Sequence, residues 1–131
     1  MPFRTNAYDA AVCALLFDHL PSIDPTVSEL ARVVRPGGRL LISNIHPSMS
    51  IVGAHAAFRD VNNEARFMRS HVHSVSTYLQ SFRDHGLTVL QCAEPSWHLD
   101  LAMAKFGYVG ESVVRAAVVG LPMALIWELE A

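Results

Sequence analysis

The sequence has little charge of either sign and little cysteine. Of its 131 residues only 17% are charged, while 51% are hydrophobic. The ten Lys and Arg residues are scattered and the formal net charge is −2, so no basic face is available and nucleic acid is not an expected partner. This balance excludes a disordered chain and favours a single α/β domain over residues 1–131 with a well-buried core.

Export signals and membrane spans are also missing. The N-terminal residues have no apolar stretch of the kind found in signal peptides. The apolar run 113–127 is interrupted by Arg115, Gly120 and Pro122, and it is shorter than the roughly 20 residues that cross a bilayer. Cys13 and Cys92 both lie in apolar stretches, where buried free thiols are expected. We therefore expect a cytoplasmic protein with no membrane partner.

Residues 8–45 have the pattern of one parallel βαβ unit. An apolar run from Asp9 to Leu16 is typical of a strand covered on both faces. Asp24 and Pro25 then predict a helix start, with Asp24 as N-cap, and the helix is expected to end near Val34.

Gly37 and Gly38 are expected to form the turn from this helix into a second buried strand, residues 39–45. In a parallel unit, ligands bind beyond the C-terminal ends of the strands. The two candidate corners of a site are therefore residues 15–20 and 44–48.

The second half of the chain is less regular. Residues 46–69 lose periodicity, although 52–58 fit a short helix, and a loop of this length is often a lid. A helix is expected from Ser74 or Ser76 to Asp84, with Gly86 ending it. Strands over 87–93 and 123–129 and a helix over 111–119 complete the pattern.

Several segments together resemble a known family. They are Tyr8-Asp9, Asp18-His19-Leu20, the run RVVRPGG at 32–38, and Asn44-Ile45-His46-Pro47, with agreeing pieces at 78–87, 94–95 and 121–126. The chain resembles class I S-adenosylmethionine-dependent methyltransferases, in the small-molecule branch that includes the ubiquinone and menaquinone methyltransferases. The resemblance implies S-adenosyl-L-methionine as cofactor and methyl transfer to a small organic acceptor. Only RVVRPGG is individually specific.

Two motifs of that family are absent from the sequence. They are the Gly-rich turn after the first strand and the acidic residue after the second, both of which contact the cofactor. The chain therefore resembles strands four to seven of a seven-stranded domain. The implied fold is α/β, a partial Rossmann-like methyltransferase fold with a mixed sheet in the order 4-5-7-6 and the last strand antiparallel. Such a chain alone is expected to bind the cofactor weakly or not at all.

The missing half would leave residues 9–16 as an open sheet edge. This strand has no proline or lysine to protect it, and only Asp9 at its start is charged. We expect the edge to be paired with a second copy or with a complementing chain, to be covered, or to aggregate. Two alternatives to an active methyltransferase follow, namely a non-catalytic remnant or assembly module that pairs through this strand, and a truncated gene product.

By position in the resemblance, the loop after the first strand implies five cofactor-binding candidates. Ala14, Leu15 and Phe17 would make apolar contacts, and core packing is the alternative for all three. Asp18 and His19 would lie beside the methionine part of the cofactor. The alternative for this pair is a solvated loop.

His46, directly after the second strand, is the catalytic candidate. An imidazole titrates near neutral pH and can accept the proton of a hydroxyl that is being methylated. Methyl transfer is an SN2 step that depends mainly on alignment, so a base is optional. Alternatively, His46 simply caps the turn at Pro47.

Substrate-binding candidates are His71, His73, Arg69 and Trp97. The two histidines resemble the family's segment ahead of its last helix, and no third residue has the spacing for a metal site. Arg69 could meet an acidic substrate, with a solvated loop as the alternative. Trp97 could form a wall of the pocket, with core packing as the alternative.

Overall fold

A four-stranded mixed sheet forms the centre of the molecule. The structure, a computed structural model, describes residues 2–51 and 56–131. Its strands stand in the order β1 (Tyr8–Ala14), β2 (Val34–Ile45), β6 (Ala124–Glu130) and β5 (Thr88–Ala93). β1 and β2 are parallel, and β6 is antiparallel to both of its neighbours. The predicted sheet order and the antiparallel last strand are confirmed.

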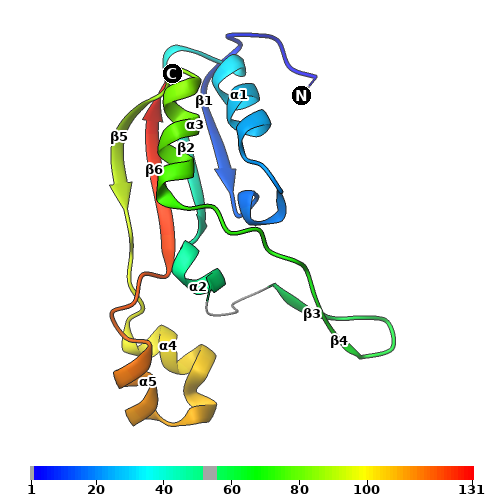
Figure 1. Cartoon of the computed structure of the whole chain (residues 1–131), viewed down its shortest axis with the longest axis vertical. Helices are drawn as coiled ribbons and strands as arrows, with labels where there is room; N and C mark the ends of the chain where they lie inside the picture. The colour runs from blue at the N-terminus through cyan, green and yellow to red at the C-terminus, as the bar shows by residue number, and fades with distance from the viewer. Residues whose placement is uncertain (1, 52–55) are drawn as a thin grey trace.

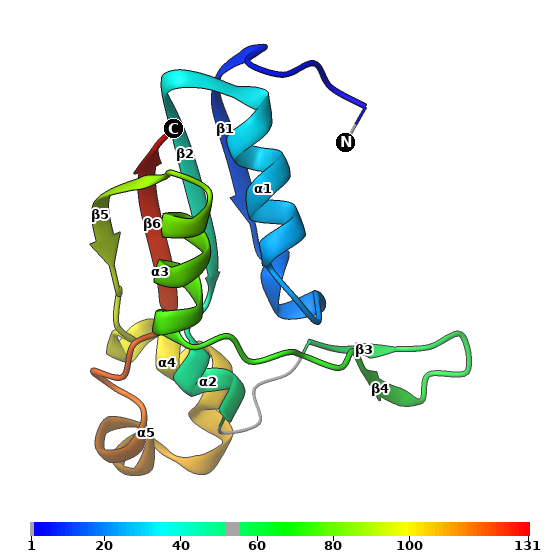
Figure 2. The same cartoon turned by 45° about the horizontal axis from the view of Figure 1, so that its top comes forward.

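Two helices, α1 (Asp24–Val33) and α3 (Val75–Asp84), lie on the same face of this sheet (Figures 1 and 2). Tyr78 and Phe82 of α3 pack on Trp127 of β6, with ring centroids 6.0 and 5.4 Å apart. The side chains buried between the helices and the sheet form one hydrophobic core. Its members include Cys13, Phe17, Ile23, Val27, Leu30, Val33, Val34, Leu40, Ile42, Tyr78, Phe82, Leu87, Leu125, Trp127 and Leu129.

The opposite face of the sheet is open over the described part of the chain. Along β2, Leu40 and Ile42 are 1% exposed, whereas Leu41 between them is 43% exposed, and Val12 of β1 is 70% exposed. The prediction that the first strand is covered on both faces is therefore wrong. Both connecting helices pack on one face, so the residues of β2 that point to the other face meet solvent.

The Pro-Gly-Gly segment is part of β2 rather than a separate turn. β2 begins at Val34, and its pairing with β1 shifts register between Tyr8 and Ala10. Gly37 has a φ of +74°, and a Cβ on Gly38 would lie 2.7 Å from the Asp9 carbonyl oxygen. The glycines therefore produce an irregular strand start that passes close to the β1 backbone.

Helix α1 begins one residue earlier than predicted. Ile23 is the N-cap, so the predicted capping role of Asp24 is wrong. The Asp24 carboxylate instead accepts a hydrogen bond from Ser81 Oγ at 3.1 Å and lies 2.9 Å from His85 Nε2. Asp24 thus connects α1 to α3.

Helix α3 has the predicted ends. The Ser74 hydroxyl accepts the N–H of Thr77 at the N-cap, and Gly86 follows the helix with a φ of +72°. Tyr78 and Phe82 of this helix are buried, while Val75 and Leu79 are 38% and 39% exposed.

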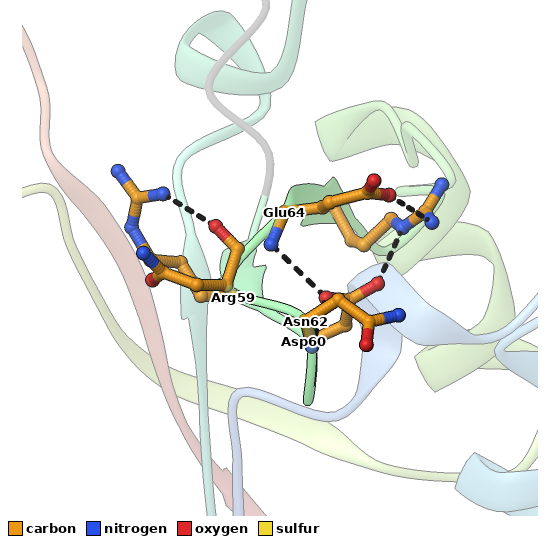
Figure 3. A network of polar contacts seen from close by, with 6 residues as sticks. Arg59, Asp60, Asn62 and Glu64 are labelled. Carbon is orange, nitrogen blue, oxygen red and sulfur yellow. Dashed lines mark hydrogen bonds and ion pairs between the residues drawn. The ribbon is translucent and has the colours of Figure 1, made fainter.

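Between β2 and α3 lie the short helix α2 (Pro47–Ile51) and a hairpin, β3 (Ala57–Arg59) and β4 (Ala65–Phe67), that projects away from the sheet (Figures 1 and 2). Of the helix predicted over 52–58, residues 52–55 lie outside the described residues, and Ala57 and Phe58 form strand instead. At the hairpin turn, shown in Figure 3, Asp60 Oδ1 accepts the backbone N–H groups of Asn62 and Glu64. The Glu64 N–H and the guanidinium of Arg66 hold the pKa of Asp60 below its ordinary value.

Two further helices, α4 (Leu99–Phe106) and α5 (Glu111–Ala117), pack together beyond one end of the sheet (Figure 1). The predicted helix over 111–119 is confirmed in part, whereas α4 was not predicted. Cys13 is a buried free thiol as expected, but Cys92 is exposed because it lies on the edge strand β5. Among the helices described, none has the length and apolar character needed to cross a bilayer.

Candidate functional site at the strand ends

The two predicted corners lie at the same end of the sheet. Ala14, the last residue of β1, pairs with Ser43 of β2, so residues 15–20 and 44–48 leave the sheet side by side. Helix α2 and the α4–α5 pair also stand at this end (Figures 1 and 2). In parallel units this is the end where ligands bind.

Leu15 has an unusual backbone at this corner. Its φ is +53°, a region that branched side chains rarely adopt, and its N–H donates to the Ser43 carbonyl at 2.7 Å. Its side chain is 59% exposed, and Ala14 is exposed too, so neither takes the core position that was the alternative. Such backbone outliers cluster at ligand sites.

Phe17 and Asp18 lie beneath that corner. Phe17 is fully buried and stacks on Tyr78 at 5.9 Å, which is the core position. Asp18 is only 7% exposed, and its carboxylate accepts the backbone N–H of Ile45. Burial raises the pKa of Asp18, against the opposing effects of that hydrogen bond and of His19 and His73. Asp18 is therefore not part of a solvated loop.

Asn44 is a structural residue of the site that the sequence reasoning missed. It is 2% exposed, its Oδ1 accepts the Phe17 N–H at 3.3 Å, and its Nδ2 donates to the Tyr78 hydroxyl at 2.8 Å. Burial raises the pKa of Tyr78 to about 12. An amide at the end of an otherwise apolar strand was the available signal.

His46 is held from both sides. Its Nε2 lies 2.8 Å from Glu94 Oε1 at the end of β5, and its Nδ1 lies 2.7 Å from Ser48 Oγ. The Ser48 N–H also donates to Nδ1, which agrees with a capping role at Pro47. Sequence reasoning missed Ser48 and Glu94 as partners, although Glu94 directly follows a predicted strand.

The histidines ahead of α3 also hold the loop after β1. His73 is 8% exposed, and its Nε2 lies within 3.1 Å of the carbonyl oxygens of Phe17 and Leu20. The backbone N–H of His71 donates to the Asp18 carbonyl at 2.7 Å. These bonds hold the loop after β1 in place. They do not test the predicted substrate-binding roles of His71 and His73, which stay predictions.

Trp97 and Arg69 are the other two substrate candidates. Trp97 is half-buried, its ring meets Phe106 of α4 edge-on at 5.4 Å, and its buried Nε1 has no hydrogen-bond partner in the described part of the chain. Arg69 is exposed on the segment that leads from the hairpin to α3. The structure therefore brings together the candidates at 14–19 with His46 at the strand ends.

An open cleft of about 520 Å³ lies between residues 21–24 and α3. Of the candidate site residues, His73 alone is among those that line this cleft in the described part of the chain. We place the site at the strand ends, where the backbone outlier and the buried polar groups gather. Among residues 2–51 and 56–131, no three His, Cys, Asp or Glu side chains are grouped as metal ligands.

Known proteins share this fold and part of this sequence. Residues 1–42 match the family described as a methyltransferase domain. A solved S-adenosylmethionine-dependent methyltransferase from Mesorhizobium loti superposes with a TM-score of 0.68 at 15% identity, covering 100% of this chain and 65% of that one. The resemblance to the class I S-adenosylmethionine-dependent methyltransferases is confirmed, and the chain carries part of their Rossmann-like fold.

More particular relatives occur within this class. The ubiquinone/menaquinone biosynthesis C-methyltransferase of Brucella canis is 31% identical over 87 residues, which are 63% of this chain and 32% of the relative. The chain thus matches about a third of that relative's length. Geranyl diphosphate C-methyltransferase from Streptomyces coelicolor, solved with S-adenosyl-L-homocysteine, has a TM-score of 0.65 at 16% identity over 99% of this chain and 49% of its own. S-adenosylmethionine is the cofactor of the class, as predicted.

Proposed function

We propose that this chain is the acceptor-side part of an S-adenosylmethionine-dependent methyltransferase that acts on a small organic acceptor. The observation that carries the proposal is the strained, exposed Leu15 above the buried Asp18, at the joined ends of β1 and β2. In this proposal Ala14 and Leu15 make apolar contact with the cofactor, while Phe17 supports the corner from the core. Asp18 and His19 fix the loop that shapes the methionine end of the site.

The acceptor would lie on the other side of the corner. This end of the sheet, where α2 and α4 also stand, is bordered by His46, by Trp97 and by the segment at His71 and His73. Relatives named for ubiquinone or menaquinone biosynthesis and for geranyl diphosphate support a small organic acceptor. We treat residues 1–131 as one domain and propose that it binds the cofactor weakly or not at all without the further strands its relatives carry.

Calorimetric titration with S-adenosyl-L-homocysteine tests this proposal. We expect no measurable heat with the chain alone and micromolar binding once the preceding part of the 31% identical relative is joined to it. In the joined protein, Leu15→Asp should weaken binding by at least about tenfold, because it places a charge where apolar contact is expected.

Leu90→Asp is the matched control, since Leu90 is a 44% exposed leucine on the far edge strand β5. It should leave the affinity unchanged. Absence of binding by the joined protein would contradict the proposed function. Micromolar binding by the chain alone would contradict the proposal that it needs the further strands to bind the cofactor.

A second candidate function is assembly through β1 without catalysis. Among the residues that the structure describes, β1 pairs with β2 alone. Val12 on β1 is 70% exposed, and Leu15 and Leu16 just beyond its end are 59% and 40% exposed. An unprotected apolar edge of this kind adds strands from other chains. Sedimentation velocity should then show a dimer whose fraction rises with protein concentration. A monomer at every concentration would count against this function.

A further inference from the structure

A continuous chain of hydrogen bonds runs through Ser48, His46 and Glu94. Ser48 Oγ lies 2.7 Å from His46 Nδ1, and His46 Nε2 lies 2.8 Å from Glu94 Oε1. Ser48 belongs to α2, His46 follows β2 and Glu94 follows β5. The backbone N–H of His46 donates to the carbonyl oxygen of Met123, the residue before β6, at 3.1 Å. These hydrogen bonds therefore connect the ends of β2 and β5 to the start of β6, at the end of the sheet that carries the candidate site.

The hydrogen bonds define where the ring proton lies. The Ser48 backbone N–H donates to His46 Nδ1 at 3.2 Å, so Nδ1 is an acceptor in this arrangement. A neutral imidazole carries its single proton on the other nitrogen, here Nε2, which faces the Glu94 carboxylate. Nδ1 then carries the lone pair of the ring, and the Ser48 hydroxyl can donate its proton to it.

Both ring nitrogens are thus occupied, and the His46 side chain is only 12% exposed. A substrate cannot reach either nitrogen directly without displacing a partner. The Ser48 hydroxyl is the group through which a proton can enter. We propose that Ser48, His46 and Glu94 form a proton relay that deprotonates a hydroxyl group of the methyl acceptor, an inference that rests on the proposed function.

The acceptor hydroxyl gives its proton to Ser48 Oγ while the Ser48 proton moves to His46 Nδ1, and the imidazolium is stabilised by Glu94. The acceptor oxygen forms a bond to the methyl carbon, and that carbon's bond to the cofactor sulfur breaks, with the electron pair going to sulfur. Glu94 is 51% exposed, so the proton on His46 can return to water through it.

The relay narrows the substrate class. An SN2 methyl transfer needs alignment but no base when the acceptor atom already carries a free lone pair and no acidic proton. A buried base with an orienting carboxylate is useful only where a proton must leave. The geometry therefore favours a phenolic or enolic hydroxyl as the acceptor.

Nitrogen-15 NMR of the chain, without cofactor, tests the proton position. At about pH 8, where a free imidazole is neutral, the His46 proton should be on Nε2 in the wild type. A wild-type proton on Nδ1 would overturn the relay.

Acetylation by 4-nitrophenyl acetate tests activation of the hydroxyl. A serine that hydrogen-bonds to a base is a nucleophile, so Ser48 should be acetylated about tenfold faster in the wild type than in His46→Gln. Glu94→Gln should lie between them, and His98→Gln, which changes an exposed histidine, should match the wild type. Peptide mass spectrometry identifies the modified residue, and circular dichroism checks that each variant is folded.

Equal acetylation of Ser48 in the wild type and in His46→Gln would overturn the proposal. Neither experiment uses S-adenosylmethionine, so the relay and the proposed function can fail separately. An active relay in a protein that never binds the cofactor would contradict only the proposed function.

Discussion

A single amide, that of Asn44, joins three parts of the molecule. It contacts the backbone of Phe17 in the 3-10 helix η1 (Phe17–His19) and the hydroxyl of Tyr78 in α3, while belonging to β2. The corner that carries Leu15 is two residues from Phe17. The position of the candidate site therefore depends on one buried side chain.

Replacing Asn44 by alanine should lower the free energy of unfolding by about 1–3 kcal/mol, because the Phe17 N–H and the Tyr78 hydroxyl would lose their buried partner. Urea unfolding measures the change. Asn62→Ala in the exposed hairpin is the matched control, expected within about 0.5 kcal/mol of the wild type. Equal effects of the two changes would contradict this role of Asn44.

Tyr78 makes stability depend on pH in alkaline solution. Burial raises its pKa in the folded chain to about 12 from an ordinary value of 10.0. The unfolded chain loses this proton first, so the contribution to stability is fully present below pH 10 and is lost as the pH rises from 10 to 12. Over that interval Tyr78→Phe should lose less stability than the wild type, by about 1–2 kcal/mol. Parallel losses in urea unfolding would show that Tyr78 is not the cause.

At the scale of elements, the irregular start of β2 depends on Gly38. A Cβ there would lie 2.4 Å from Val34 Cγ1 and 2.7 Å from the Asp9 carbonyl, whereas a Cβ on Gly37 would meet nothing within 4 Å. Gly38→Ala should therefore destabilise the chain by about 1–3 kcal/mol through overpacking against β1.

Gly37→Ala is the paired change, because it tests the positive φ without a clash. It should cost about 1 kcal/mol. Chemical denaturation of the two variants separates close packing from backbone conformation. A larger effect at Gly37 would mean that the approach of β2 to β1 is not what requires Gly38.

The sequence predicted the four strands of the main sheet from their apolar runs, and the two helices that pack on them from the capping and stop residues at their ends. It could not predict α4 or the hairpin β3–β4. The α4 sequence, LDLAMAKF, is apolar on most sides and packs mainly on α5, and the hairpin strands are three exposed residues each. Neither has a pattern that local physics can distinguish from a loop.

The site was predictable in position but not in its contacts. Chain order and strand direction placed residues 15–20 and 44–48 together. Which groups would meet depended on β5 lying beside β6, which brings Glu94 to His46 across 48 positions of sequence. The buried state of Asp18 and the bond from Asn44 to Tyr78 likewise arise from packing between distant elements.

At the scale of the whole molecule, the sheet has two edges with different surroundings. Val12 on β1 is 70% exposed beside the candidate site, and Leu90 on β5 is 44% exposed at the far edge. If β1 is the pairing edge, Val12→Lys should shift the sedimentation profile towards monomer, because a lysine on an edge strand opposes strand addition. Leu90→Lys should not. A shift caused only by Leu90→Lys would assign the association to β5.

The position of β6 has a consequence for how the chain reaches this state. β6 is synthesised after β1, β2 and β5, yet it lies between β2 and β5 and provides all the pairing that connects them. Until β6 leaves the ribosome, β5 lacks the strand with which it pairs, and Tyr78 and Phe82 of α3 lack Trp127 to pack on. The sheet therefore closes late, through contacts far apart in sequence, which favours slow folding and a period in which unpaired strands are open to chaperones.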